Sequence, residues 1–126
     1  MIAVDTSALF SIAAGEAKAP DCAKVLAAEP EILISAGTLA EALIVASRKN
    51  IAVEMKRLIK GAGLTVVPVT EADAILVAEA YDRWGRGAHP AALNYGDCFA
   101  YVLAKQRNCP LLFVGNDFSQ TDVQVT

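Results

Sequence analysis

Short apolar runs alternate along this chain with longer segments whose apolar residues recur at helical spacing. Four of the short runs predict buried strands, because each is rich in apolar residues and is bounded by polar residues, Gly or Pro. They cover residues 2–4, 32–34, 64–69 and 111–114, and a further run at 123–125 predicts a fifth strand at an edge.

The longer segments predict six helices, at residues 6–14, 21–28, 38–49, 51–60, 71–84 and 94–107. Several ends carry sequence signals. Gly15 ends the first helix, Pro20 precedes the second, and Thr70 is suited to cap the fifth, which has acids in its first turn. Residues 85–90 are rich in Gly and predict a loop.

Apolar strands that alternate with helices are typical of an α/β fold, in which helices cover both faces of a parallel sheet. The length of 126 residues fits one domain, residues 1–126, and no repeat, linker or low-complexity stretch divides it. In open parallel sheets, ligands bind at the carboxyl ends of the strands. Functional residues are therefore expected at that edge.

Four acids stand in apolar surroundings with no Lys or Arg beside them: Asp5, Glu41, Asp97 and Asp117. Asp5 ends the first strand and Asp117 follows the fourth, whereas Glu41 and Asp97 lie about one turn into helices that begin or end near the same sheet edge. A buried carboxylate needs a partner, and several carboxylates can share a cation. Oxygen ligands without a histidine set indicate Mg²⁺ or Mn²⁺.

Each of these acids also has a purely structural interpretation. Asp5 is suited to cap the first helix, Asp117 to open a turn, and both Thr38–Glu41 and Asn94–Asp97 fit a capping box. Against capping alone, Glu41 and Asp97 share their helix faces with apolar residues three and four positions further on. Convergence of all four at one edge is harder to obtain from capping.

The net charge is −3, which argues against a nucleic-acid ligand. This changes if the four acids belong to a metal site and are left out of the count. Ten of the 14 acids then remain against 11 basic residues. The basic residues cluster between Arg48 and Lys60, and Arg83 and Arg86 flank Trp84 and Gly85. These clusters are either solvated helix faces or contacts for an RNA backbone.

Other chemistry is sparsely represented. One histidine, His89, excludes a His-based zinc site and disfavours a Ser-His-Asp triad. Cys22, Cys98 and Cys109 form no CxxC pair and predict buried thiols in a reducing compartment. With no membrane-length apolar run and no basic, apolar leader, we expect a cytoplasmic protein.

The chain resembles PIN domains, and more narrowly the VapC toxins of bacterial toxin–antitoxin pairs. Four segments carry the resemblance, in order and over the whole chain: Ile2-Ala3-Val4-Asp5-Thr6-Ser7-Ala8-Leu9, Ile34-Ser35-Ala36-Gly37-Thr38-Leu39-Ala40-Glu41, Asn94-Tyr95-Gly96-Asp97-Cys98-Phe99-Ala100-Tyr101 and Leu112-Phe113-Val114-Gly115-Asn116-Asp117-Phe118. It implies a three-layer α/β/α sandwich with sheet order 3-2-1-4-5, and a Mg²⁺- or Mn²⁺-dependent endoribonuclease.

The resemblance also implies roles for individual residues. Asp5, Glu41, Asp97 and Asp117 become catalytic metal ligands, and a second set supports them: Thr6, Ser7, Asn116 and, less directly, Asp122. The implied partners are an RNA substrate, a VapB-type antitoxin and a second copy of the chain, with no membrane. An antitoxin segment is expected in a groove of the first two helices, lined by Ala8, Leu9, Ile12, Ala13, Val25 and Leu26.

Two other functions remain open at this stage. A Mg²⁺-dependent phosphoryl-transfer or receiver-like domain also uses acids at strand ends, but it needs a lysine near the late strands, where only Lys105 is available, on a helix. A non-catalytic RNA-binding PIN-like module is the other. Trp84 and Tyr95 are candidates for stacking on bases, or for core packing.

Overall fold

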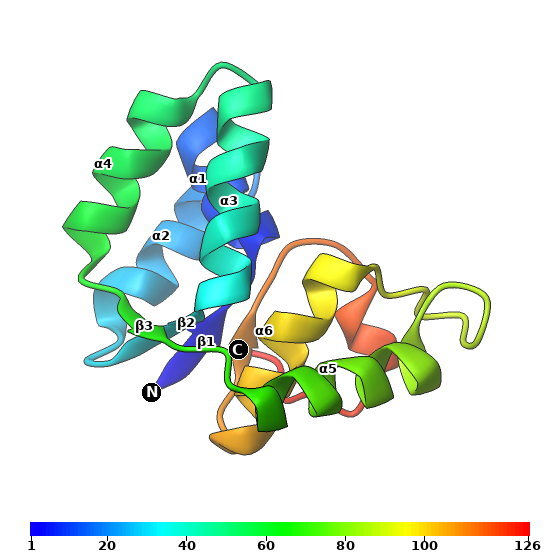
Figure 1. The fold of residues 1–126 in the computed structure, drawn as a ribbon. Helices are drawn as coiled ribbons and strands as arrows, with labels where there is room; N and C mark the ends of the chain where they lie inside the picture. The colour runs from blue at the N-terminus through cyan, green and yellow to red at the C-terminus, as the bar shows by residue number, and fades with distance from the viewer.

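Four short parallel strands form the centre of the fold in the computed structural model, which describes residues 1–126 (Figure 1). They are β1 (Ile2–Val4), β2 (Ile32–Ser35), β3 (Thr65–Val67) and β4 (Leu111–Leu112), in the order β3-β2-β1-β4. In the registers, Ile2 lies opposite Ile32 and Ala3 opposite Leu111. The parallel sheet and the order 3-2-1-4 confirm the expected fold class.

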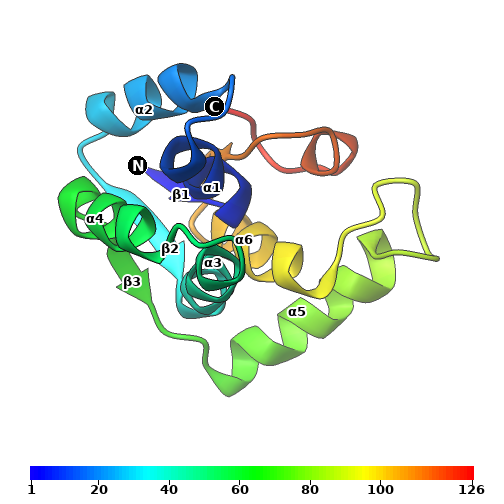
Figure 2. The ribbon, with the colours of Figure 1, turned by 90° about the horizontal axis from the view of Figure 1, so that it is seen from above.

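Six helices cover the two faces of the sheet (Figures 1 and 2). They are α1 (Thr6–Ala14), α2 (Ala19–Ala28), α3 (Ala36–Arg48), α4 (Ala52–Ala62), α5 (Glu71–Trp84) and α6 (Tyr95–Gln106). Alternate strand residues point to opposite faces. Ile2 and Val4 pack with α1 to α4, whereas Ala3 packs with α5 and α6, so each face has its own apolar cluster.

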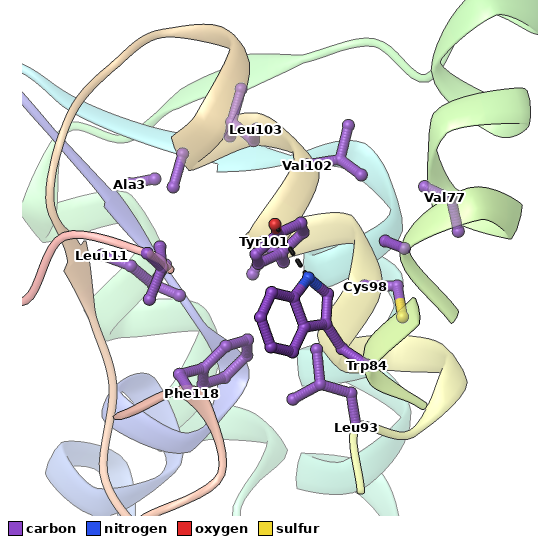
Figure 3. Packing of buried hydrophobic residues seen from close by; sticks show 14 of the residues in the cluster. Ala3, Val77, Trp84, Leu93, Cys98, Tyr101, Val102, Leu103, Leu111 and Phe118 are labelled. Carbon is purple, nitrogen blue, oxygen red and sulfur yellow. Dashed lines mark hydrogen bonds between the residues drawn. The ribbon is translucent and has the colours of Figure 1, made fainter. Parts of the chain in front are cut away.

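The core on the α5–α6 side is built around Trp84, which is 8% exposed (Figure 3). Its Nε1 donates a hydrogen bond to the hydroxyl of Tyr101 at 3.0 Å. Trp84 is therefore a core residue and is not available for base stacking, whereas Tyr95 is 71% exposed. The three cysteines are buried and free, as expected. None of the helices combines the length and apolar character needed to cross a membrane.

Two helix starts differ from the sequence prediction. α2 begins at Ala19, with Pro20 inside its first turn rather than before it. α3 begins at Ala36, and its cap is Ser35, whose side chain accepts a hydrogen bond from the backbone N–H of Gly37 at 3.2 Å. The predicted Thr38–Glu41 capping box is therefore wrong, because Ser35 caps the helix three residues earlier and Thr38 is buried within it.

The predicted fifth strand is also wrong. Val125 makes a single parallel bridge with Leu111, and the N–H of Leu111 donates to the carbonyl of Gln124 at 2.8 Å. β4 has only two residues, so it offers too short an edge for a further ladder. A short 3₁₀ helix, η1 (Phe118–Gln120), precedes this segment, and Phe118 and Val123 are buried in the α5–α6 cluster.

Candidate active site

Asp5 is the most buried of the four acids, with 3% of its surface exposed. It follows β1 and caps α1: its Oδ2 accepts hydrogen bonds from the backbone N–H of Ser7 at 3.0 Å and from the Ser7 hydroxyl at 2.7 Å. Its Oδ1 is buried without any hydrogen-bond donor. Burial raises the pKa of Asp5 to about 7, against the hydrogen bonds of Ser7, and the charges of Asp97 and Glu41 raise it further.

Ser7 connects this carboxylate to the neighbouring strand. The Ser7 hydroxyl donates to Asp5 and accepts a hydrogen bond from the backbone N–H of Val114, just after β4, at 3.0 Å. One side chain thus joins the ends of β1 and β4, which are hydrogen-bonded neighbours in the sheet. The support that we expected from Ser7 has a direct geometric basis.

Glu41 reaches the site from the second turn of α3. Thr6 donates a hydrogen bond from its hydroxyl to Glu41 Oε1 at 2.6 Å. On its other side the Glu41 carboxylate lies against Gly96 in the first turn of α6, so closely that a Cβ atom at Gly96 would overlap Glu41 Oε2. Thr6 and Gly96 together define the position of this carboxylate.

Asp97 lies in the first turn of α6 and forms a capping box with Asn94. The backbone N–H of Asp97 donates to Asn94 Oδ1 at 2.8 Å, and the N–H of Asn94 donates to Asp97 Oδ2 at 2.9 Å. Burial raises the pKa of Asp97 to about 6 despite the Asn94 hydrogen bond, and the charges of Glu41 and Asp117 raise it further. Capping thus occupies Oδ2 and leaves Oδ1 without a protein donor.

Asp117 is held less tightly than the other three acids. It lies on the exposed segment between β4 and η1, and its side chain makes no capping hydrogen bond. Its negative charge nevertheless adds to burial in raising the pKa of Asp97. Asn116 is exposed beside it, and its carbonyl accepts a hydrogen bond from the Ser119 hydroxyl at 2.6 Å.

Asp122 makes its contacts elsewhere. It accepts a hydrogen bond from the Tyr101 hydroxyl at 2.5 Å and forms an ion pair with Lys105 at 3.2 Å. These contacts lower the pKa of Asp122, chiefly through the Tyr101 hydrogen bond. Asp122 therefore ties the C-terminal segment to α6, and no contact joins it to the four acids.

The carboxylates do not form a closed ligand cage. No three acidic, histidine or cysteine side chains lie close enough to enclose an ion in their present conformations. The donor set still fits a hard cation, because Asp5 Oδ1 is a buried acceptor without a donor and because burial and nearby like charges raise the pKa of both Asp5 and Asp97. Mg²⁺ commonly binds through one or two carboxylates and keeps several waters.

Histidine and cysteine side chains contribute no ligands here. His89 Nδ1 accepts a hydrogen bond from the backbone N–H of Ala91 at 3.0 Å, and its ring packs edge-on against Trp84. Cys98 follows Asp97 but is buried, and burial raises the pKa of its thiol to about 11. The site is therefore one of carboxylates and hydroxyls.

Sequence reasoning missed two residues at this site. Gly96 was quoted only as part of a motif, although a glycine in the first turn of a strongly apolar helix is a signal of close approach. Arg86 was noted for its charge, but nothing in the sequence distinguished it from Arg83. The structure hydrogen-bonds its backbone N–H to the carbonyl of Leu93, directly before the Asn94–Asp97 capping box.

The PIN domain family model matches residues 2–124. The chain belongs to the PIN domain family. Within this family it is similar to the VapC ribonuclease Mb0625 of Mycobacterium bovis and to ribonuclease VapC28 of Mycobacterium tuberculosis. Each is 43% identical over 125 residues, which cover 96% of this chain and 94% of the relative. The recognition drawn from the four motifs is confirmed.

Solved structures show the same PIN fold. The toxin VapC20 of Mycobacterium tuberculosis, described as cleaving the sarcin-ricin loop, has a TM-score of 0.79 and 20% identity, with 100% of this chain and 98% of that chain covered. A toxin–antitoxin complex from Klebsiella pneumoniae has a TM-score of 0.73 and 17% identity, with coverages of 100% and 97%. At these identities the likeness concerns the fold alone.

Proposed function

We propose that this PIN domain is a Mg²⁺- or Mn²⁺-dependent endoribonuclease that acts as the toxin of a toxin–antitoxin pair. The observation that carries the proposal is the buried carboxylate of Asp5, whose Oδ1 has no donor and which lies in the field of Asp97 and Glu41. The names of the relatives, which are ribonucleases of the VapC type, support the choice of RNA as substrate.

The residues have distinct roles in this proposal. Asp5 and Asp97 each offer a free oxygen on a side chain whose other oxygen is held by hydrogen bonds, so they are the preorganised ligands. Glu41, oriented by Thr6, and the loop residue Asp117 complete the set. When bound, the metal supplies an activated water and stabilises the charge that develops on the phosphate and the leaving oxygen.

Second-layer contacts keep this arrangement in place before substrate arrives. Ser7 fixes Asp5 relative to the end of β4, and Gly96 leaves the space that the Glu41 carboxylate fills. Removal of such a contact typically lowers metal affinity or activity by roughly 10–100-fold. The supporting roles of Thr6 and Ser7 are therefore the strongest among those expected, whereas Asn116 has no side-chain contact that supports one.

The receiver-like alternative is not favoured by the position of its required lysine. Lys105 pairs with Asp122 at 3.2 Å and donates to the Asp122 carbonyl at 3.5 Å. Both contacts hold it near the C-terminal end of α6, whereas the candidate acids lie near the N-terminal end of that helix. A phosphoryl-transfer mechanism that uses this lysine is therefore not proposed.

The antitoxin is proposed to occupy an apolar groove of about 460 Å³ between α1, α2 and α4. Ile12, Ala23, Leu26 and Leu58 contribute to its lining. The expectation for Ala8 and Leu9 was wrong, because both are fully buried in the core and face no partner. Toxin–antitoxin complexes among the structural neighbours support a partner of the VapB type.

A homodimer is proposed through exposed apolar residues of α3, α5 and α6, of which Tyr81 and Tyr95 line one apolar pocket. Ile44 on α3, Tyr81 on α5 and Tyr95 on α6 are all exposed, and Tyr95 packs edge-on against Phe99. Large apolar side chains that gather at the surface often mark a protein interface. Sedimentation at several concentrations tests this, and Ile44→Asp should shift the protein to the monomer.

The decisive experiment incubates the purified chain with RNA in Mg²⁺, in Mn²⁺ and in EDTA, with Asp5→Asn as the inactive control. We expect cleavage with either ion, none in EDTA, and none by the variant. Undiminished cleavage in EDTA would reject the metal mechanism. RNA binding without cleavage under every condition would support the non-catalytic RNA-binding module instead.

A further inference from the structure

Arg86 lies on a closed loop next to the candidate site and has no acidic partner. The two ion pairs of the structure join the N-terminus to Glu29 and Lys105 to Asp122. Arg86 is exposed, in the first part of the segment that connects α5 to α6 (Figure 2). Its charge is therefore available to a ligand.

The loop that carries Arg86 is anchored at both ends. Gly85 and Leu93 pair as an isolated parallel bridge, the N–H of Arg86 donates to the Leu93 carbonyl at 3.0 Å, and the N–H of Leu93 donates to the Trp84 carbonyl at 3.1 Å. Within the loop, the N–H groups of Ala88 and His89 both donate to the carbonyl of Gly85. The backbone at Arg86 is thus fixed relative to the start of α6.

This anchoring holds the backbone of Arg86 next to the start of α6, whose first turn carries Asp97. Leu93 directly precedes Asn94, whose N–H donates to Asp97 Oδ2. Burial raises the pKa of the Asp97 carboxyl, and the positive charge of Arg86 lowers it in part. The Arg86 backbone is thus hydrogen-bonded to the residue that directly precedes the Asn94–Asp97 capping box.

Arg83, three residues earlier, is directed elsewhere. Its Cζ lies 4.5 Å from the centre of the Trp84 ring, and its charge acts on Tyr101 and Asp122 rather than on Asp97. The two arginines that the sequence could not distinguish thus serve different parts of the molecule. Arg83 stacks on the core tryptophan, and Arg86 is left for a ligand at the site.

We infer that Arg86 binds a backbone phosphate of the RNA substrate next to the cleaved bond. The inference rests on the proposed ribonuclease function. Four carboxylates repel a polyanion, so a cation at the rim of the site is needed to hold the strand where they act. A guanidinium suits this role because its planar fork matches two phosphate oxygens and because it is always charged.

The test measures binding of a short fluorescein-labelled single-stranded RNA by anisotropy, in the Asp5→Asn background and in EDTA, between about 50 and 200 mM KCl. Arg86→Ala should weaken binding roughly five- to tenfold at low salt and reduce the salt slope by about 0.7, the value for one phosphate contact on a single strand. Arg86→Lys should retain most of the slope. Arg83→Ala is the matched control and should stay within about twofold of the parent.

The outcomes separate this inference from the proposed function. Unchanged affinity and slope for Arg86→Ala, or an equal loss for Arg83→Ala, would overturn it, and so would a variant that keeps RNA affinity but loses affinity for the antitoxin. If the parent binds RNA with the expected Arg86 dependence while the wild type cleaves nothing in Mg²⁺ or Mn²⁺, only the nuclease proposal fails. If the parent binds no RNA at any salt concentration while the wild type cleaves RNA in Mg²⁺ or Mn²⁺, the Arg86 inference fails and the nuclease proposal stands.

Discussion

Helices α5 and α6 begin with the same local motif in two different environments. Thr70 and Asp73 form a capping box at the start of α5, with hydrogen bonds of 3.2 and 2.9 Å, and Asn94 and Asp97 form the corresponding box at the start of α6, with 2.8 and 2.9 Å. Yet hydrogen bonding, led by that from the Thr70 backbone, lowers the pKa of Asp73, whereas burial raises that of Asp97 to about 6.

The second oxygen of each carboxylate explains the contrast. Asp73 Oδ1 accepts a hydrogen bond from Gln106 at 2.7 Å, so both oxygens of this half-buried carboxylate have donors. Asp97 Oδ1 has no protein donor, and burial together with the charges of Glu41 and Asp117 raises the pKa of this carboxyl. A capping acid therefore becomes a candidate catalytic acid only where the fold brings other carboxylates to it, and the capping box of Asp97 is compatible with the catalytic role proposed for it.

The largest expected effect separates the two boxes by activity. Asp97→Asn should reduce RNA cleavage by more than about a hundredfold, because it removes a charged ligand from the site. Asp73→Asn makes the same chemical change in the same motif and should leave cleavage within about twofold. Initial rates at saturating Mg²⁺ measure both. Comparable losses in the two variants would mean that capping, and not metal chemistry, accounts for the role of Asp97.

The next effect concerns stability without metal. The pKa values of Asp5 and Asp97 are raised to about 7 and 6 from an ordinary value of 3.8, so between about pH 4 and 7 the folded protein binds more protons than the unfolded chain. The free energy of unfolding in EDTA should therefore fall as the pH rises through this range, by on the order of a few kcal/mol. Urea titrations at several pH values measure it.

Asp5→Asn sharpens this measurement. The variant lacks the largest titrating group, so its stability in EDTA should depend less on pH and should exceed that of the wild type near pH 7. Saturating Mg²⁺ should flatten the wild-type curve in the same way, by stabilising the ionised carboxylates. A wild type whose stability in EDTA rises over this range would show that the acids are satisfied caps and not a strained, empty site.

A third prediction concerns Gly96, which has no counterpart in the α5 box. Gly96→Ala should displace the Glu41 carboxylate, because the new Cβ would overlap Glu41 Oε2, and should reduce Mn²⁺ affinity by about tenfold. Gly61→Ala in α4 is the matched control, since nothing lies within 4 Å of its added Cβ. It should stabilise the helix by up to about 1 kcal/mol and leave Mn²⁺ affinity unchanged. Calorimetric titration with Mn²⁺ measures both, and equal affinities would remove Gly96 from the site.

The smallest effect comes from the capping partners themselves. Thr70→Ala and Asn94→Ala should each lower the free energy of unfolding by about 1 kcal/mol, because each removes one N-cap hydrogen bond. Only Asn94→Ala should also weaken Mn²⁺ binding, since it frees Asp97 to move. Thermal melts with and without Mn²⁺ separate the loss of helix capping from the loss of Mn²⁺ binding. A metal effect in both variants would show that helix fraying, rather than the position of Asp97, is responsible.

The local pattern of apolar and polar residues was enough to locate most helices and strands and the four acids. All four main strands and all six helices lie where apolar periodicity places them, within a few residues, because that periodicity reports which face of a segment is buried. The order of the strands came from the resemblance to PIN domains and not from the pattern. The errors fall at the ends: Ser35 caps α3 in place of Thr38, and the segment at Val125 makes one bridge instead of a strand.

Several assignments depended on contacts between residues far apart in the chain. Asp122 follows the fourth acid in sequence but is held by Tyr101 and Lys105, and Trp84, a candidate for stacking, is buried in the core. Arg83 and Arg86 look alike in sequence and differ in what they face. None of these outcomes leaves a signal in the neighbouring residues.

The sequence by itself determined which segments bury an apolar face, where helices begin and end to within a few residues, and which acids have no nearby cation, because these properties depend on residues a few positions apart. Tertiary structure decided which of the two capping boxes, Thr70–Asp73 or Asn94–Asp97, belongs to the candidate active site. The pKa of a carboxylate and the availability of its oxygens depend on burial and on charges brought close through space. Burial raises the pKa of Asp97, and the charges of Glu41, Asp117 and Arg86, all distant in sequence or in another element, act on it only in the folded chain.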